Sequence, residues 1–365
     1  MKIDKVTATA YRIPTDAPEA DGTLAWDATT LVVAEARCAD ATGLGWTYAP
    51  AEAAAAVNGM LAKVVTGREV LDVPGANEAM ARAVRNAGRP GLMGCALSAV
   101  DIALWDLKAR LLRLPLVRLI GAVTEEVPVY GSGGFTTYHD TRMAAQLTGW
   151  TRGHGIPRVK IKIGESWGRA VSRDLDRVRH ARETIGPEVA LYVDANGAYS
   201  RKQAVRVGEV LAELGVRWFE EPVSSDDLEG LRVVRDNCAC DVAAGEYGYD
   251  LAYFARLAPV VDCLQADATR CGGVTGWLRA AAVAHAHGLE ISGHCAPHAH
   301  AHMAACVPNL RHLEWFHDHV RIESAYFSGA LDPAGGVLRP GATEEPGHGM
   351  RFDHDKAAEF RVGQG

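Results

Sequence analysis

Charged and titratable side chains recur at the ends of short apolar segments in the second half of the chain. They are Lys160, Lys162, Asp194, Glu220, Glu246, Asp267, His294 and Glu314. Lysine and histidine are common general acids and bases. Carboxylates brought together form an all-oxygen site, which suits a hard cation such as Mg²⁺ better than zinc.

The spacing of three of the carboxylates is regular. Intervals of 26 residues separate Asp194 from Glu220 and Glu220 from Glu246. A single carboxylate at a strand end often only caps the next helix or meets solvent, but a regular series over consecutive strands is not explained in that way. Like charges gathered at one point repel unless a cation lies between them. We therefore predict a carboxylate metal site.

A second cluster, "ISGHCAPHAHAH" at residues 291–302, contains four histidines. His294 ends an apolar segment 27 residues after Asp267, and we expect it to be the histidine engaged in chemistry. His298, His300 and His302 follow in the next loop or helix, where we expect them to line the mouth or a helix surface. Of these three, His298 is the one expected to contact a substrate.

These residues need a fold that points them at one place. From Val127 onward, short apolar segments alternate with longer amphipathic ones. The short segments are "VPVYG", "RVKIKIG", "ALYVDAN", "VRWFEEP", "DVAAGE", "CLQADA", "LEISGH" and "RHLEW". Such alternation predicts right-handed parallel units, and eight of them close a barrel whose carboxyl strand ends surround one mouth. The fold class is therefore α/β, a modified TIM barrel of the (β/α)7β kind.

Residues 1–125 predict a separate α+β capping domain. Alternation of polar and apolar residues predicts strands within residues 30–48. Helical periodicity marks "AEAAAAVNGMLAKVVTG" and "LSAVDIALWDLKARLL". We expect the Pro/Gly/Asp-rich segment 14–27 to be a mobile loop, and Asp101 and Asp106 to be solvated or helix-pairing charges. Residues 126–329 form the barrel, and residues 330–365 fold back to complete the capping domain.

Bulk properties exclude several function classes. The 365 residues carry a net charge of -7 without a basic cluster, which argues against nucleic-acid partners. No apolar run approaches the ~20 residues of a membrane span, and the N-terminus does not resemble a signal peptide. Eight scattered cysteines suit a reducing compartment, so we expect a cytoplasmic enzyme. Capped barrels commonly associate, and a homo-oligomer is expected.

As an ordered set, the motifs resemble the enolase superfamily, and within it the mandelate racemase subgroup. They are "KIK" with Lys160 and Lys162, "VDAN" with Asp194 and Asn196, "FEEP" with Glu220 and Glu221, "AGE" with Glu246, "DATRCGG" with Asp267 and Arg270, "SGH" with His294, and "LEW" with Glu314. The closing "PGHGMRFD" also matches, so the resemblance spans nearly the whole chain.

The resemblance implies a function and a role for each residue. One Mg²⁺ on Asp194, Glu220 and Glu246 would bind a substrate carboxylate and stabilise the enediolate formed when the α-proton leaves. Glu314, protonated or hydrogen-bonded, would lie near the other carboxylate oxygen. No further cofactor is expected.

The resemblance also implies two acid/base groups. Lys162 would be one, with Lys160 beside it lowering its pKa and contacting the substrate carboxylate. His294, oriented by Asp267, would act on the opposite face. Asn196 is expected to bind a substrate hydroxyl.

Three reactions remain open, and all take a small carboxylate substrate. We favour dehydration of an aldonate-type acid sugar to a 2-keto-3-deoxy acid, and racemisation or epimerisation and cycloisomerisation are the alternatives. Thr269 stands where muconate-cycloisomerase and dipeptide-epimerase types carry a lysine, which argues against those activities.

Other classes fit less well. A zinc hydrolase on a barrel needs a His-x-His motif on the first strand, which "VPVYGSG" lacks, and a non-catalytic relative would have lost a proton-transfer residue. The segment 14–26 has three acids and no basic residue, which favours a monocarboxylic substrate over a diacid unless Arg85 or Arg89 reaches the site.

Overall fold

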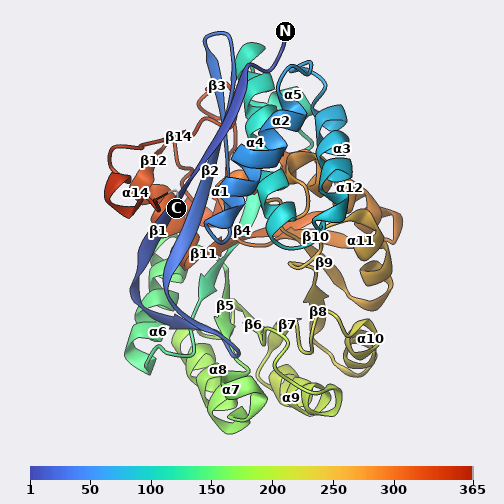
Figure 1. Ribbon diagram of the computed structural model, residues 1–365. Coiled ribbons are helices and arrows are strands. Elements are labelled where there is room, and N and C mark those ends of the chain that lie inside the picture. Colours follow the sequence, from blue (N-terminus) through green and yellow to red (C-terminus); the bar gives the residue numbers. More distant parts are fainter. Residues whose placement is uncertain (364–365) are drawn as a thin grey trace.

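Eight parallel strands form a closed ring at the centre of the larger part of the molecule (Figure 1). The computed structural model describes residues 1–363. The ring closes where Leu313 of the last strand pairs with Val129 of the first, which confirms the predicted barrel. Its strands are β4 (Val127–Gly133), β5 (Arg158–Lys162), β6 (Ala190–Asp194), β7 (Val216–Glu220), β8 (Asp241–Ala244), β9 (Cys263–Ala266), β10 (Glu290–Gly293) and β11 (Leu310–Phe316).

Helices cover the outside of the ring, so both faces of each strand are buried, as is typical of parallel sheets. They are α6 (Asp140–Thr148), α7 (Glu165–Gly168), α8 (Val171–Ile185), α9 (Arg201–Glu213), α10 (Leu228–Asn237), α11 (Leu251–Leu257), α12 (Gly273–Ala286), α13 (Pro297–Ala304) and α14 (His317–Tyr326). Inside the ring, Tyr130, Tyr192 and Trp218 pack as an aromatic plug together with His312. This plug closes the interior, so the strand residues beyond it can form a site only at the open end.

The capping domain consists of an antiparallel sheet and helices packed on it. The sheet contains β1 (Lys5–Ala20), β2 (Ala25–Cys38) and β3 (Ala41–Tyr48), and the helices are α1 (Glu52–Ala56), α2 (Ala62–Val65), α3 (Val73–Ala83), α4 (Leu92–Leu111) and α5 (Leu116–Ile120). The long helix α4 lies directly on β3, since a Cβ at Gly43 would come within 2.2 Å of the Ala103 carbonyl oxygen. The predicted α+β character of this part is confirmed.

The segment 14–26 is not the mobile loop that its composition predicts. It extends β1 and β2 into a long hairpin, with a register shift between Pro14 and Glu19. Backbone hydrogen bonds from Thr136 N to Ala20 O (2.8 Å) and from Trp167 N to Gly22 O (2.9 Å) fix its end to loops of the barrel. The prediction was wrong because these partners lie more than a hundred residues away in the chain.

Asp101 and Asp106 are fully buried, so neither is a solvated charge. Asp106 is a helix-pairing charge, as the alternative expects, because its Oδ2 lies 2.6 Å from Arg110 Nε four residues later in α4. Asp101 accepts hydrogen bonds from Thr275 N (3.0 Å) and Thr275 Oγ1 (2.7 Å) at the start of α12, and from Asn77 Nδ2 (2.8 Å). Asp106 accepts hydrogen bonds from the backbone N–H groups of Leu44 and His348. Both carboxylates are therefore anchors that join α4 to other parts of the fold.

The residues after the barrel contact both parts of the molecule. β13 (Val337–Leu338) pairs antiparallel with β4, and β14 (Arg351–Phe352) pairs with β12 (Phe327–Ser328). Val362 N donates a hydrogen bond to Ala10 O of the capping sheet (2.9 Å). The division into residues 1–125 with 330–365, and residues 126–329, stays a prediction, because this last segment contacts both the barrel and the capping sheet.

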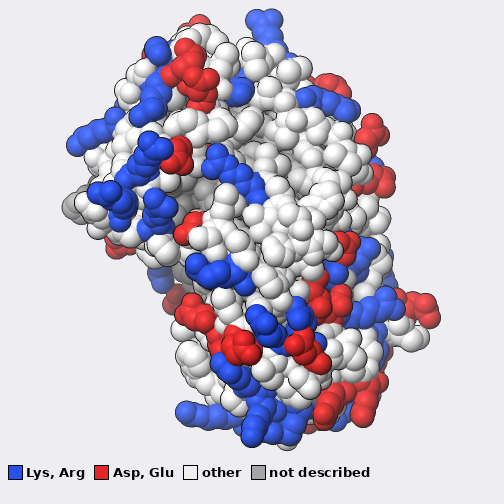
Figure 2. Space-filling view, turned by 90° about the vertical axis from the view of Figure 1, so that its right-hand side faces the viewer, with Lys and Arg blue, Asp and Glu red and all other residues white. Residues whose placement is uncertain are grey.

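On the face shown in Figure 2, basic and acidic side chains are interspersed, in keeping with the modest net charge of -7. Among residues 1–363, no helix has the length and apolar character needed to cross a membrane.

Candidate active site

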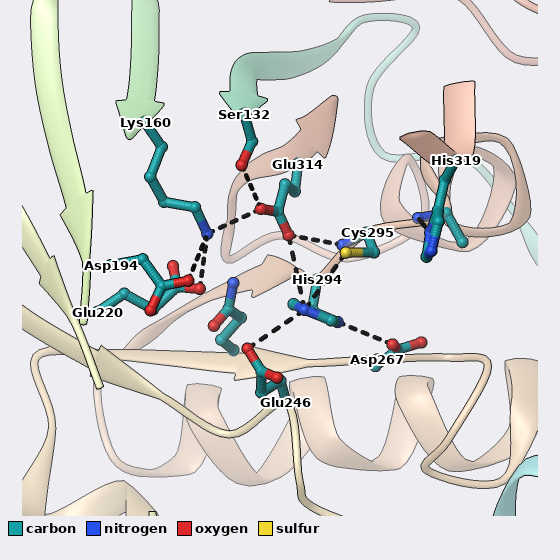
Figure 3. Close-up of polar contacts among 12 residues, drawn as sticks. Ser132, Lys160, Asp194, Glu220, Glu246, Asp267, His294, Cys295, Glu314 and His319 are labelled. Carbon is teal, nitrogen blue, oxygen red and sulfur yellow. Dashed lines mark hydrogen bonds and ion pairs between the residues drawn. The ribbon is translucent and has the colours of Figure 1, made fainter. Parts of the chain in front are cut away.

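Three buried carboxylates meet at the open end of the barrel (Figure 3). Asp194 and Glu220 are the last residues of β6 and β7, and Glu246 follows β8 by two residues. One oxygen from each lies within 4.8 Å of the others. The parallel strands explain the convergence, because their carboxyl ends surround the same mouth.

Two lysines of β5 point into the barrel beside these carboxylates. Lys160 Nζ lies 2.6 Å from Glu220 Oε1 and 2.8 Å from Glu314 Oε1, and Lys162 Nζ lies 2.5 Å from Asp194 Oδ2. Burial alone would lower the pKa of both lysines, but the carboxylates outweigh it and raise both pKa values. The expected lowering of the Lys162 pKa by Lys160 is therefore outweighed by Asp194 in this structure.

His294 and Asp267 form a second proton-handling unit next to the carboxylates. Asp267 Oδ2 lies 2.8 Å from His294 Nδ1, and His294 Nε2 lies 3.2 Å from Glu246 Oε2. Burial would raise the pKa of Asp267, but the hydrogen bond from His294 and the charge of Arg270 hold it below its usual range. Asp267 is thus a fixed carboxylate that holds one ring nitrogen of His294.

Glu314 also belongs to the group of charged side chains at the open end of the barrel. Its Oε1 accepts a hydrogen bond from Ser132 Oγ (2.6 Å), and its Oε2 accepts one from Cys295 N (2.8 Å). Burial would raise its pKa, but Lys160 and His294 lower the pKa below the ordinary value. Both oxygens accept hydrogen bonds, in agreement with the hydrogen-bonded alternative of the prediction. Glu314 is also not the last residue of its strand, because β11 continues to Phe316.

A cavity of about 210 Å³ opens beside these groups. The barrel contributes Lys162, Asn196, Glu246, Tyr247, Asp267, Thr269, Arg270, His294, Cys295, Phe316 and His319 to its wall. The capping domain contributes Asp21, Trp26, Ala28, Thr29 and Tyr48. The cavity therefore lies between the two parts of the protein, with the reacting groups on the barrel side.

Asn196 lies where the sequence predicts a substrate contact. It lines the cavity with a left-handed backbone (φ 46°), and its N–H donates a hydrogen bond to Asp194 Oδ1 (2.8 Å). Its amide Oδ1 is buried and has no partner among the described residues. An unpaired buried amide oxygen is costly, which favours a bound partner there.

The other three histidines of the cluster lie away from the cavity, and their predicted location was wrong. His298 is buried, with Nδ1 hydrogen-bonded to Glu323 and Nε2 3.3 Å from the Leu331 carbonyl oxygen, so the expected substrate contact is not supported. His300 accepts a hydrogen bond from Ala268 N (2.8 Å).

His302 accepts a hydrogen bond from Val117 N (3.1 Å) and lies 3.2 Å from the His348 carbonyl oxygen. These partners belong to other elements that cover α13. The histidines are therefore internal structural residues.

Sequence reasoning missed several residues of the site. The sequence assigned no role to four residues, which are Ser132, Tyr48, Cys295 and His319. For Ser132 and Tyr48, the sequence contained a weak indication that the side chain lies near the site. Ser132 lies on β4 two residues after Tyr130, so both side chains face the barrel interior. Tyr48 ends β3, but its approach to the barrel depends on how the capping domain docks.

The donor set fits a magnesium ion. All three converging groups are carboxylates, and Glu246 Oε2 is buried without a hydrogen bond among residues 1–363. Lys160 and Lys162 lie against Asp194 and Glu220, and Arg270 and His294 lie against Glu246. Hard oxygen ligands of this kind match Mg²⁺, which binds through a few carboxylates and leaves positions for other oxygen ligands.

A capped barrel with carboxylates, two lysines and an Asp–His pair at its mouth defines an enzyme of the enolase superfamily. Residues 142–356 match the family model described as enolase C-terminal domain-like, and residues 12–121 match the N-terminal domain of mandelate racemase / muconate lactonizing enzyme. The chain belongs to the mandelate racemase and muconate lactonizing enzyme family.

Similar proteins cover the whole chain. A mandelate racemase/muconate lactonizing enzyme-like protein from Rubrobacter xylanophilus is 48% identical with a TM-score of 0.96, over 99% of this chain and 100% of that one. The 3,6-anhydro-alpha-L-galactonate cycloisomerase of Streptomyces coelicolor is 31% identical over 99% of this chain and 100% of its own length.

A third relative bears on the metal. The L-talarate/galactarate dehydratase structure from Salmonella typhimurium, liganded with Mg and L-lyxarohydroxamate, is 26% identical with a TM-score of 0.89, over 99% and 93% of the two chains. Relatives of this chain thus include dehydratases and cycloisomerases. The magnesium in that structure and the three carboxylates here both agree with the predicted cofactor.

Proposed function

We propose that the protein removes the proton α to the carboxylate of a sugar acid in the presence of Mg²⁺, and that the net reaction is dehydration of an aldonate-type acid to a 2-keto-3-deoxy acid. The observation that carries the proposal is the pairing of two proton-transfer units around one metal site. Lys162 and the His294–Asp267 pair both line the cavity, beside Glu246.

Each residue then has a distinct task. When bound by Asp194, Glu220 and Glu246, Mg²⁺ supplies positive charge to the substrate carboxylate and to the enediolate. Lys160, held by Glu220 and Glu314, adds a fixed ammonium on the carboxylate side.

The proton steps follow from the two nitrogen bases. In its neutral form, Lys162 Nζ takes the proton from C2, and the electron pair of that bond moves into the carboxylate to give the enediolate. His294 Nε2 then donates a proton to the C3 hydroxyl as the C3–O bond breaks and water leaves. The resulting enol tautomerises to the 2-keto-3-deoxy acid. Asp267 keeps His294 oriented throughout, because it holds Nδ1.

The wall of the cavity supports a monocarboxylic substrate. Its cationic residues besides His294 are Lys162 and Arg270, and Arg270 is engaged by Glu246 Oε1 (3.3 Å) and Asp267 Oδ2 (3.4 Å). The capping-domain side offers neutral groups such as Thr29 and Tyr48. Arg89 lines a different cavity, so it does not supply the missing cation there.

Cycloisomerisation of an anhydro sugar acid is the second candidate. The full-length similarity to the 3,6-anhydro-alpha-L-galactonate cycloisomerase favours it. Both reactions begin with removal of the α-proton, and they differ in whether water or an internal ring oxygen is released from C3.

A panel of aldonates and 3,6-anhydro-aldonates, incubated with enzyme and Mg²⁺ in D₂O, distinguishes these reactions. Proton NMR reports deuterium at C2, and mass spectrometry reports loss of water. Loss of water with a 2-keto-3-deoxy product supports dehydration, and a ring-opened isomer of unchanged formula supports cycloisomerisation. Absence of both C2 exchange and product across the panel would contradict the proposal.

A further inference from the structure

One histidine outside the cluster forms part of the cavity wall. His319 lies in α14, is 8% exposed, and lines the cavity together with His294 and Cys295. Its Nδ1 accepts a hydrogen bond from Ala296 N at 3.2 Å. A ring nitrogen that accepts from an amide carries no proton, so the proton of the neutral ring is on Nε2.

The ring is held rigidly in this orientation. It stacks on Tyr48 with ring centroids 3.4 Å apart and planes 10° apart, and the edge of Phe316 packs against it. Tyr48 is fixed in turn, because its hydroxyl donates a hydrogen bond to Glu323 Oε1 at 2.9 Å. Glu323 also accepts a hydrogen bond from Trp46 Nε1, so the capping domain holds the position of His319.

The environment keeps His319 neutral. Burial lowers its pKa to about 3, and the nearby charges of Asp267 and His294 act in opposite directions. At neutral pH the ring is therefore a hydrogen-bond donor at Nε2 and not a source of protons. Within residues 1–363, Nε2 has no hydrogen-bond partner, and the cavity is the space left for one.

We propose that His319 is a specificity-determining residue whose Nε2–H donates a hydrogen bond to a hydroxyl or ring oxygen of the substrate beyond its reacting carbons. The inference deepens the proposed function and rests on the same cavity. A substrate that lacks this oxygen leaves the N–H unpaired on binding, and that penalty is the usual basis of strong discrimination by polar sites.

Binding in the presence of Mg²⁺ tests the donor. The probes are six-carbon aldonates and glycolate, which has the carboxylate and α-hydroxyl but no distal oxygen. In calorimetric titration, His319→Phe should weaken binding of the tightest aldonate by about 10- to 100-fold, and glycolate binding should stay within about twofold. His319→Gln, which retains an N–H donor, should lie between wild type and His319→Phe.

The matched control is His317→Gln, two residues earlier at the start of α14, where the ring contacts Asp16. This variant should bind both probes like wild type. Equal weakening of aldonate and glycolate by His319→Phe would mean a general structural role and overturn the inference. Failure of every aldonate to bind more tightly than glycolate would also overturn it.

Two readouts separate this inference from the proposed reaction. If wild type binds an aldonate without exchanging its C2 proton, the proposed reaction fails and the affinity ratios alone decide the role of His319. Independently, ¹⁵N NMR at neutral pH should report the Nε2–H tautomer, with the signal assigned by its loss in His319→Gln. The Nδ1–H tautomer would overturn the inference.

Discussion

Asp267 Oδ2 lies 2.8 Å from His294 Nδ1, which leaves Nε2 as the ring nitrogen that faces the cavity. The carboxylate is itself fixed, since its other oxygen accepts hydrogen bonds from Thr269 N and Thr269 Oγ1, both at 2.7 Å. The pair therefore has a single orientation, with one residue that moves a proton and one that holds the ring.

Loss of His294 should separate the two proton transfers. His294→Ala is expected to lower kcat for dehydration by about 10²- to 10⁴-fold, because the leaving hydroxyl loses its general acid. Deuterium exchange at C2 should persist, since Lys162 remains. Lys162→Ala should abolish both. NMR in D₂O follows the two processes in one sample, and loss of exchange in His294→Ala but not in Lys162→Ala would reverse the assigned roles.

Removal of the metal should abolish activity. EDTA should stop turnover and added Mg²⁺ should restore it, because the substrate carboxylate and enediolate lose their counter-charge. Glu220→Gln should lower both Mg²⁺ affinity, measured by calorimetry, and turnover.

Glu221→Gln is the matched control for Glu220→Gln. Glu221 is buried next to Glu220 in the chain but is not one of the three converging carboxylates. The metal should bind this variant within about tenfold of wild type. Full activity in metal-free protein, or equal loss of affinity in both variants, would argue against the carboxylate site.

The barrel and the converging groups were predictable because both depend on local patterns. Apolar segments at regular intervals predict parallel strands, and residues such as Asp194 and Glu220 end those segments. Parallel topology then brings the strand ends together without further information.

Other features depend on partners that no local pattern indicates. The hairpin 14–26 has the composition of a loop, and its fixation comes from Thr136 and Trp167. Polar histidines at alternate positions of α13 give no helical periodicity that indicates a buried face, but Val117 and Glu323 meet His302 and His298 from other parts of the chain. Long-range contacts, among them the docking of the capping domain, therefore decided what the sequence could not.

Asp101 offers a test of that docking. Asp101→Ala should lower the free energy of unfolding by about 3 kcal/mol, because Thr275 N, Thr275 Oγ1 and Asn77 Nδ2 lose their buried acceptor. Urea titration followed by circular dichroism measures the change. Asp40→Ala, at an exposed turn, should remain within about 0.5 kcal/mol of wild type. Equal stability of the two variants would contradict the anchoring role.

The last prediction concerns the distal end of the substrate. A diacid sugar carries a second carboxylate, which needs a cation once it leaves water. The hairpin carries three acids, Asp16, Glu19 and Asp21, and each of them has different neighbours. Asp16 pairs with Arg142 and His317, and Glu19 is buried beside Trp26 Nε1, where burial raises its pKa to about 8.

Asp21 is the acid of the hairpin that lines the cavity, and Thr23 and Leu24 hold it by hydrogen bonds from their N–H groups. A carboxylate in that position repels a second carboxylate and accepts hydrogen bonds from hydroxyls. We therefore expect kcat/KM for an aldonate to exceed that for the matched aldarate by about tenfold or more, a difference of about 1.4 kcal/mol. Asp21→Asn should bring the ratio of the aldonate and aldarate kcat/KM values closer to one. The substitution removes the repulsion of the second carboxylate, and the amide can still hydrogen-bond to hydroxyls. A clear preference of the wild-type enzyme for the aldarate would show that a cation reaches the distal end, and the monocarboxylic assignment would be wrong.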